Sequence, residues 1–215
     1  PINLRKQAAE HLVRTIKKNG WKLSTGFVGT QMLLPALSHT GYTDVAYRLL
    51  LSEEPPSWIT QIKDGATTIW ERWDGWTPEK GFQDASMNSF NHYAFGSVGQ
   101  WLFNTVAGIE PVAPGFQTIR LCPQVGGELE YVKATFNSVH GKILSEWKIK
   151  NGQYQWDVVI PPNTTANICV PGENIKEGHA KINKAYGITP LRKENEPENF
   201  SIVSGQYKFT SRLNK

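Results

Sequence analysis

One carboxylate in this sequence lies in surroundings that suit proton transfer. Glu71 follows Trp70 and precedes Arg72 and Trp73. Indole rings near a carboxylate shield it from bulk water, while a neighbouring guanidinium favours its ionised form. A carboxylate held in this way can act as a general base near neutral pH. The alternative is structural: Glu71 pairs with Arg72 or a helix end, and the two tryptophans only pack.

A second polar pair, Asn91 and His92, comes just before or at the start of an expected helix. Side chains at that point could project into a cavity. The alternative is that Asn91 caps the helix and His92 satisfies a buried carbonyl. The sequence has no phosphate-binding glycine loop, no Gly-x-Ser-x-Gly elbow and no His or Cys spacing typical of a metal site. We therefore expect neither a metal nor a cofactor.

The first half of the chain carries helical patterns that must position these residues. Apolar residues recur every four positions in the first segment, and Gly20 follows it as a C-cap candidate. Thr30, Asp44 and Ser57 are candidate starts of three further helices, and a longer helix is expected to end at Gly108. Such short amphipathic helices bury their faces poorly unless they meet more helices.

The pattern changes after Pro111–Gly115, which reads as a rigid turn or linker. Beyond it, apolar and polar residues alternate in several short runs, and Lys150-Asn151-Gly152 is typical of a hairpin turn. Short strands at this spacing indicate an antiparallel sandwich. We therefore expect two domains, residues 1–112 and 113–215.

Composition narrows the function classes. The formal net charge of +4 comes from lysines and arginines scattered among acids, whereas nucleic-acid binders concentrate them in a patch. No apolar run approaches the length needed to cross a membrane. Buried free thiols are expected for Cys122 and Cys169, with a bridge as the alternative. Nothing in the sequence distinguishes a periplasmic, secreted or cytoplasmic location.

Six segments of the first half carry a recognisable pattern, and they are Thr25–Thr30, Leu33–Leu37, Gly41–Leu50, Pro56–Trp58, Gly65–Glu71 and Asn88–Gly96. In order and spacing, over roughly residues 25–124, these segments resemble the inverting bacterial α-L-rhamnosidases. The segment Ser204–Phe209 also looks like the end of that family's C-terminal domain.

The resemblance implies an α+β multidomain chain, with the last helices of an (α/α)6 barrel followed by an antiparallel β-sandwich. It implies hydrolysis of terminal non-reducing α-L-rhamnose from rhamnosides with inversion. Glu71 would then be the general base and His92 a sugar contact, and we add Trp73 as a candidate for the pocket wall.

One departure from the family matters for catalysis. The family's acid-bearing stretch, which ends in Gly-Trp-Thr-Gly-Asp, does not occur in this sequence, and the nearby acids Asp64, Asp74, Glu79 and Asp84 do not match it. We therefore expect an incomplete fragment of the enzyme that works with its N-terminal half. A non-catalytic carbohydrate-binding fragment and another glycosidase on a helical toroid are the alternatives.

Overall fold

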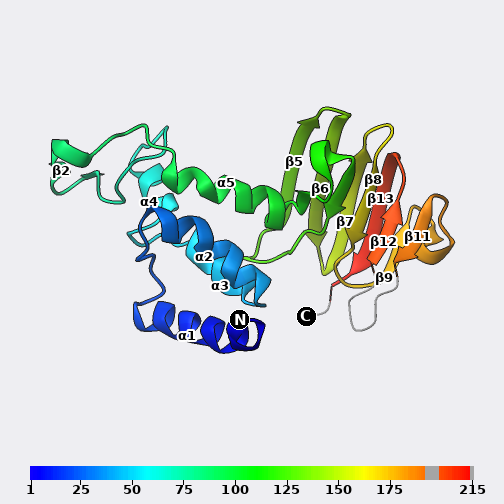
Figure 1. Cartoon of the computed structure of the whole chain (residues 1–215), viewed down its shortest axis with the longest axis horizontal. Helices are drawn as coiled ribbons and strands as arrows, with labels where there is room; N and C mark the ends of the chain where they lie inside the picture. The colour runs from blue at the N-terminus through cyan, green and yellow to red at the C-terminus, as the bar shows by residue number, and fades with distance from the viewer. Residues whose placement is uncertain (192–198, 214–215) are drawn as a thin grey trace. The chain divides into compact units, whose positions relative to one another are not determined.

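The computed structural model describes residues 1–191 and 199–213 and divides the chain into two compact units, Pro1–Trp101 and Leu102–Lys215 (Figure 1). Helices dominate the first unit and sheets the second, which confirms the predicted order of a helical part followed by a sandwich. The charged stretch Lys193–Glu198 lies outside the described residues. No helix in the described ranges has the length and hydrophobicity to cross a bilayer.

The two units divide earlier in the chain than the expected boundary between residues 112 and 113. The strand β3 (Ile109–Pro111) pairs antiparallel with β4 (Thr118–Leu121) and so joins a sheet of the second unit. The segment expected to be a turn contains the short 3-10 helix η5 (Pro114–Phe116). As the limit between two domains, the position 112/113 stays a prediction.

The first unit is built from short helical segments joined by long loops. Its α-helices are α1 (Arg5–Lys18), α2 (Phe27–His39), α3 (Thr43–Leu50), α4 (Trp58–Lys63) and α5 (Val98–Trp101), with the 3-10 turns η1 (Ile2–Leu4), η2 (Ala85–Met87) and η3 (Ala94–Ser97) and the two-residue strands β1 (Trp76–Thr77) and β2 (Gly81–Phe82).

Two of the expected helix starts are wrong and one is confirmed. Helix α2 begins at Phe27, and Thr30 lies inside it, where its hydroxyl bonds to the backbone oxygen of Thr25. Helix α3 begins at Thr43, one residue before the expected cap Asp44. Ser57 does cap α4, because its side chain accepts from the backbone N–H of Thr60 at 3.0 Å.

The core of the first unit lies between α2, α3 and α5. Leu34, Leu37 and Leu49 are almost fully buried there. The ring of Tyr47 meets that of Trp101 edge to face, and the indole N–H of Trp101 donates to Ser38 Oγ at 2.9 Å. A buried indole that finds such a partner keeps its packing energy without an orphaned donor. These helices therefore form the packed core of the first unit.

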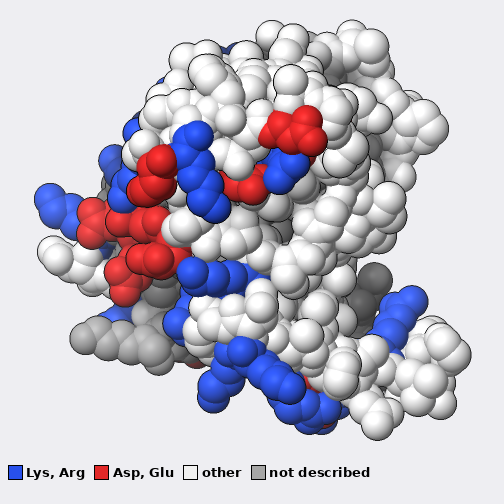
Figure 2. Space-filling view, turned by 90° about the vertical axis from the view of Figure 1, so that its left-hand side faces the viewer, with Lys and Arg blue, Asp and Glu red and all other residues white. Residues whose placement is uncertain are grey.

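Positive charge in the first unit is concentrated on α1. Figure 2 shows a row of blue side chains at the bottom of the face in view, where α1 lies, while blue and red side chains are mixed elsewhere on that face. The basic residues of α1 are Arg5, Lys6, Arg14, Lys17 and Lys18.

The second unit is a β-sandwich of a six-stranded and a five-stranded sheet, in the orders β10-β9-β13-β7-β6-β5 and β11-β12-β8-β4-β3 (Figure 1). Among the strands in the described residues, the pairing is antiparallel except between β4 and β8, which run parallel. The remaining elements are the π-helical segment η4 (Leu102–Val106), the 3-10 turn η6 (Ile182–Lys184) and the strands β5 (Tyr131–Ser138), β6 (Gly141–Lys150), β7 (Gln153–Ile160), β8 (Thr165–Cys169), β9 (Glu173–Glu177), β10 (Ala180–Lys181), β11 (Ile188–Leu191), β12 (Asn199–Ile202) and β13 (Gly205–Arg212).

The turn predicted at Lys150-Asn151-Gly152 joins β6 to β7. Asn151 and Gly152 both have positive φ, 53° and 74°, as a type I′ hairpin turn requires. Trp147, Trp156 and Phe209 fill the sandwich core from the six-stranded sheet, and all three are at most 1% exposed. Alternation along these strands therefore identified the inward faces correctly.

The expectation of free thiols is wrong. Cys122 and Cys169 form a disulfide, with their Cα atoms 4.6 Å apart. Leu121 at the end of β4 lies in register with Ile168 of β8, so the next residue of each strand falls opposite the other. The bridge, which the sequence left open as the alternative, is therefore what the structure shows, and the parallel pairing of β4 with β8 that brings the two cysteines together could not be read from the sequence.

Candidate active site

Two loop segments of the first unit, which carry Glu71 and His92, are joined side by side by backbone hydrogen bonds. The N–H of Glu71 donates to the oxygen of Ser89 and the N–H of His92 donates to the oxygen of Ile69, both at 2.8 Å. The hydroxyl of Thr68 also donates to the oxygen of Phe90. The structure therefore brings together the two motifs that the sequence singled out.

The carboxylate of Glu71 is held by a backbone amide. The N–H of Ser89 donates to Glu71 Oε2 at 2.8 Å, so the two residues bond to each other in both directions. This hydrogen bond engages Oε2 and restrains the side chain. Glu71 is half-buried, which leaves its carboxylate reachable.

The guanidinium of Arg72 pairs with Asp74 and not with the adjacent glutamate. Arg72 Nε and Nη2 donate to the two oxygens of Asp74 at 3.0 and 3.1 Å. The hydrogen bond with Asp74 raises the pKa of Arg72, to which the charge of Glu71 adds, and lowers the pKa of Asp74. Arg72 thus supplies positive charge near Glu71 without occupying its oxygens.

The imidazole of His92 is held by one hydrogen bond and two ring contacts. The backbone N–H of Ala94 donates to His92 Nδ1 at 3.3 Å. This bond requires a lone pair on Nδ1, so the ring proton lies on Nε2, which can donate to a ligand. The rings of Phe27 and Tyr93 stack on the imidazole with centroids 4.8 and 5.4 Å away.

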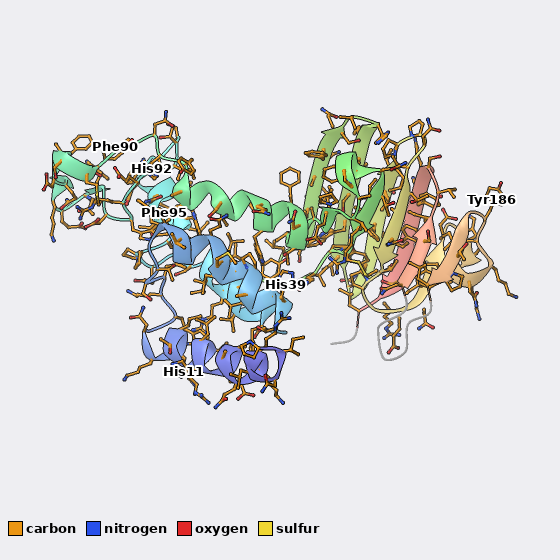
Figure 3. The ribbon with its side chains drawn as sticks, in the orientation of Figure 1. His11, His39, Phe90, His92, Phe95 and Tyr186 are labelled. Atoms are coloured by element: carbon orange, nitrogen blue, oxygen red, sulfur yellow. A yellow bond between two sulfur atoms is a disulfide. The ribbon has the colours of Figure 1, made fainter. Side chains whose placement is uncertain are left out.

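Trp73 packs inward as well as lying close to the site. Its ring stacks on Phe95 with centroids 3.9 Å apart and meets Trp58 edge to face at 5.2 Å. Its indole N–H is buried without a hydrogen-bond partner among the described residues. Trp70 is buried against Phe90. Figure 3 shows Phe90, His92 and Phe95 gathered in the same loop region of the first unit.

Sequence reasoning missed the residues that fix the loop around Glu71. Gln61 Nε2 donates to the oxygen of Arg72 at 2.9 Å, and Asn88 Nδ2 donates to that of Gly75 at 2.8 Å. A Cβ at Gly75 would lie 2.6 Å from Asn88 Oδ1, so a larger residue there would displace this amide. Gly75, four residues after Glu71, was the one sign in the sequence of such a close contact.

The nearby acid Asp84 is engaged in a hydrogen bond of its own. Asp84 accepts from the backbone N–H of Ser86 at 2.9 Å at the start of η2, and this bond lowers the pKa of Asp84. In residues 1–191 and 199–213, no three His, Cys, Asp or Glu side chains gather in a way that could hold a metal ion.

Family models cover most of the chain. Residues 1–106 match the model described as the bacterial alpha-L-rhamnosidase 6 hairpin glycosidase domain, and residues 108–185 match the bacterial alpha-L-rhamnosidase C-terminal domain. The chain belongs to the bacterial α-L-rhamnosidase family. It corresponds to the C-terminal portion of that family's members, with helices of the hairpin domain followed by the β-sandwich.

Curated relatives are much longer than this chain. An α-L-rhamnosidase of Streptomyces avermitilis is 44% identical over 210 residues, which are 98% of this chain and 20% of the relative. One from Formosa agariphila is 36% identical over 211 residues, 97% of this chain and 23% of the relative. The chain thus spans about a fifth of the length of these rhamnosidases.

Solved structures of two rhamnosidases superpose on the chain. The Streptomyces avermitilis enzyme complexed with L-rhamnose has a TM-score of 0.89 at 43% identity, covering 99% of this chain and 20% of that one. The native Aspergillus terreus enzyme has a TM-score of 0.83 at 33% identity, covering 98% of this chain and 22% of that one.

Proposed function

We propose that this chain is the C-terminal part of an inverting α-L-rhamnosidase, which releases terminal non-reducing α-L-rhamnose from rhamnosides. Family membership and the likeness to a rhamnosidase crystallised with L-rhamnose support the substrate class. The observation that carries the proposal is the hydrogen bond from the Ser89 amide to Glu71 Oε2, which orients a carboxylate beside the loop of His92.

In this proposal Glu71 is the general base. With Oε2 held by Ser89, the other oxygen accepts a proton from a water molecule. The water oxygen attacks the anomeric carbon from the face opposite the leaving oxygen, and the bond to the aglycone breaks as the new bond forms. The configuration at the anomeric carbon is therefore inverted.

His92 binds the sugar and Trp73 contributes to the wall of the pocket. The proton on His92 Nε2 can donate to a sugar hydroxyl, because Nδ1 is engaged with Ala94. Trp73 offers an indole N–H that has no acceptor among the described residues. An indole near a sugar supplies both an apolar face and a donor.

The general acid comes from the N-terminal half of the longer enzyme. An inverting glycosidase needs a second carboxyl group about 6.5–9.5 Å from the base, protonated before reaction. Asp74 and Asp84 are poor candidates, because hydrogen bonds from Arg72 and from the Ser86 amide lower their pKa values and favour the ionised form. The chain alone should therefore be inactive.

The test is Glu71→Gln in the complete enzyme that carries this chain. Gln keeps the size and the acceptor for Ser89 but cannot take a proton. We expect kcat on an aryl α-L-rhamnoside to fall about 10³-fold, as general-base removal typically does, while L-rhamnose binding measured by calorimetry stays within a few-fold.

Two comparisons make the outcome decisive. Asp64→Asn, at a nearby acid outside the proposed machinery, should leave kcat near the parental value. His92→Ala should weaken L-rhamnose binding instead. Near-parental hydrolysis by Glu71→Gln would show that another group activates the water.

A further inference from the structure

A continuous series of aromatic rings runs through the first unit from α4 to the candidate sugar-binding histidine. It links the start of α4, the loop that carries Glu71, the 3-10 turn η3, the start of α2 and the segment just before η3. Its members, each in contact with the next, are Trp58, Trp73, Phe95, Phe27, His92 and Tyr93. The histidine is thus part of one packed assembly of rings, and Trp73, two residues after the proposed base, belongs to the same assembly.

Phe27 is the ring of this series that joins the scaffold to the imidazole. It is the first residue of α2, and it meets Phe95 edge to face at 5.4 Å while stacking on His92 at 4.8 Å with the planes 26° apart. Phe95 is itself 3% exposed, and its backbone oxygen accepts from Trp58 Nε1 at 3.0 Å. Phe95 is therefore held in place, and Phe27, which packs against it, can support the imidazole of His92.

An imidazole needs such a support because its own rotamer does not set its plane. The χ2 torsion of histidine is broad, so the direction of Nε2–H depends on neighbours. The N–H of Ala94 donates to Nδ1 and so restrains the position of this one ring atom. Phe27 lies against a face of the ring and limits its tilt.

We infer that Phe27 is a positioning residue for sugar binding: its ring sets the plane of His92, and so aims Nε2–H at the substrate. The inference rests on the proposed function, in which His92 contacts the sugar. It assigns a role to the start of α2, far from both motifs in sequence.

The first experiment compares Phe27→Leu with Phe27→Tyr in the complete enzyme. Leu keeps apolar bulk but has no flat face, whereas Tyr keeps the ring. We expect Phe27→Leu to raise the Kd for L-rhamnose and the KM for an aryl rhamnoside about 5- to 10-fold, the size of a lost aromatic contact. Phe27→Tyr should stay within about twofold of the parent. Unchanged binding in Phe27→Leu overturns the inference.

A double-mutant cycle separates positioning from general packing. If Phe27 acts through His92, Phe27→Leu should not weaken L-rhamnose binding further in a His92→Ala background. Full additivity of the two effects would overturn the role. Phe103→Leu is the control for an aromatic of similar exposure, 40% against 38%, and should change neither Kd nor KM.

Two further measurements keep the test clear. The melting temperature of each variant is recorded, and if Phe27→Leu unfolds the protein, Phe27→Met replaces it with the same expected loss. If Glu71→Gln stays active and His92→Ala still binds L-rhamnose, the proposed function fails. If those two behave as proposed while Phe27→Leu and Phe27→Met bind normally, only the role of Phe27 fails.

Discussion

At the scale of single residues, backbone amides hold both the proposed general base and the proposed sugar-binding side chain. The N–H of Ser89 holds the carboxylate of Glu71, and the N–H of Ala94 holds the imidazole of His92. A backbone amide leaves no trace in residue type, so neither bond could be predicted from the sequence. What could be predicted was the type of chemistry, from a carboxylate among indole rings and a histidine in a polar cluster.

The partner of Arg72 shows the same limit. Adjacency in the sequence suggested an ion pair with Glu71, but the guanidinium bonds to Asp74 through two nitrogens. Residues next to each other in a loop point in different directions, and only the fold decides which pair meets. The alternative in which Glu71 pairs with Arg72 therefore does not match the structure.

Tyr47 gives a residue-scale prediction for alkaline pH. Its side chain is fully buried, and burial raises the pKa of Tyr47 above its ordinary value. Because the folded state holds the phenol proton of Tyr47 more tightly than the unfolded state does, this proton adds to the free energy of unfolding. The addition is complete below the ordinary tyrosine pKa of about 10 and is lost as pH rises beyond it. The fall in melting temperature between pH 9 and pH 11 should therefore be smaller in Tyr47→Phe than in the parent.

Tyr186→Phe is the matched control, because Tyr186 is 98% exposed. That variant should lose melting temperature between the two pH values as the parent does. An identical fall in all three proteins would mean that Tyr47 ionises as readily folded as unfolded.

At the scale of elements, strands with clear alternation were predictable and polar ones were not. Runs in β5 to β8 and in β13 alternate as the sequence indicated. The strand β9 buries none of its residues, so its sequence carries no inward face to recognise. The expected long helix up to Gly108 is instead a succession of η3, α5 and η4, because local apolar spacing does not distinguish helix types.

A buried polar cluster in the second unit gives an element-scale prediction. Ser145 of β6 donates to the oxygen of Ala107 at 2.7 Å and accepts from Trp156 Nε1 of β7 at 2.9 Å. Ser145→Ala would leave the indole N–H and the carbonyl unpaired in the core, which costs about 1–3 kcal/mol. Native-state hydrogen exchange should report that loss as a lower opening free energy for β6 and β7.

The control is Ser138→Ala, at the last residue of β5 beside the turn to β6. Ser138 bonds to the oxygen of Gly141, but it is only partly buried. Water can replace that bond, so the opening free energy should fall by less than about 1 kcal/mol. Equal losses in the two variants would contradict the special importance of the Ser145 cluster.

At the scale of the whole molecule, the helical unit leaves large apolar side chains of α2 and α4 exposed. Val28 and Met32 of α2 and Ile62 of α4 are 81%, 61% and 62% exposed. Such exposure agrees with the expectation from the sequence that helices this few and short bury their faces poorly. The curated relative from Streptomyces avermitilis is about five times longer than this chain.

The disulfide between Cys122 and Cys169 gives a prediction for the stability of the second unit. It closes 47 positions of chain, and such a bridge stabilises a fold by about 2–4 kcal/mol. A digest of the unreduced enzyme should contain one cross-linked peptide with Cys122 and Cys169. Cys122→Ser should lower the opening free energy of β4 and β8 by that amount, and an unchanged value would contradict a stabilising bridge.

The measurement that tests the central claim most directly is the rescue of Glu71→Ala by azide in the complete enzyme. Azide is already an anion and needs no base, so it can attack the anomeric carbon where water no longer can, while the general acid still protonates the aglycone. We predict hydrolysis reduced about 10³-fold without azide, and formation of β-L-rhamnosyl azide when azide is added. Near-parental hydrolysis without azide, or a rhamnosyl azide of α configuration, would contradict Glu71 as the base of an inverting reaction.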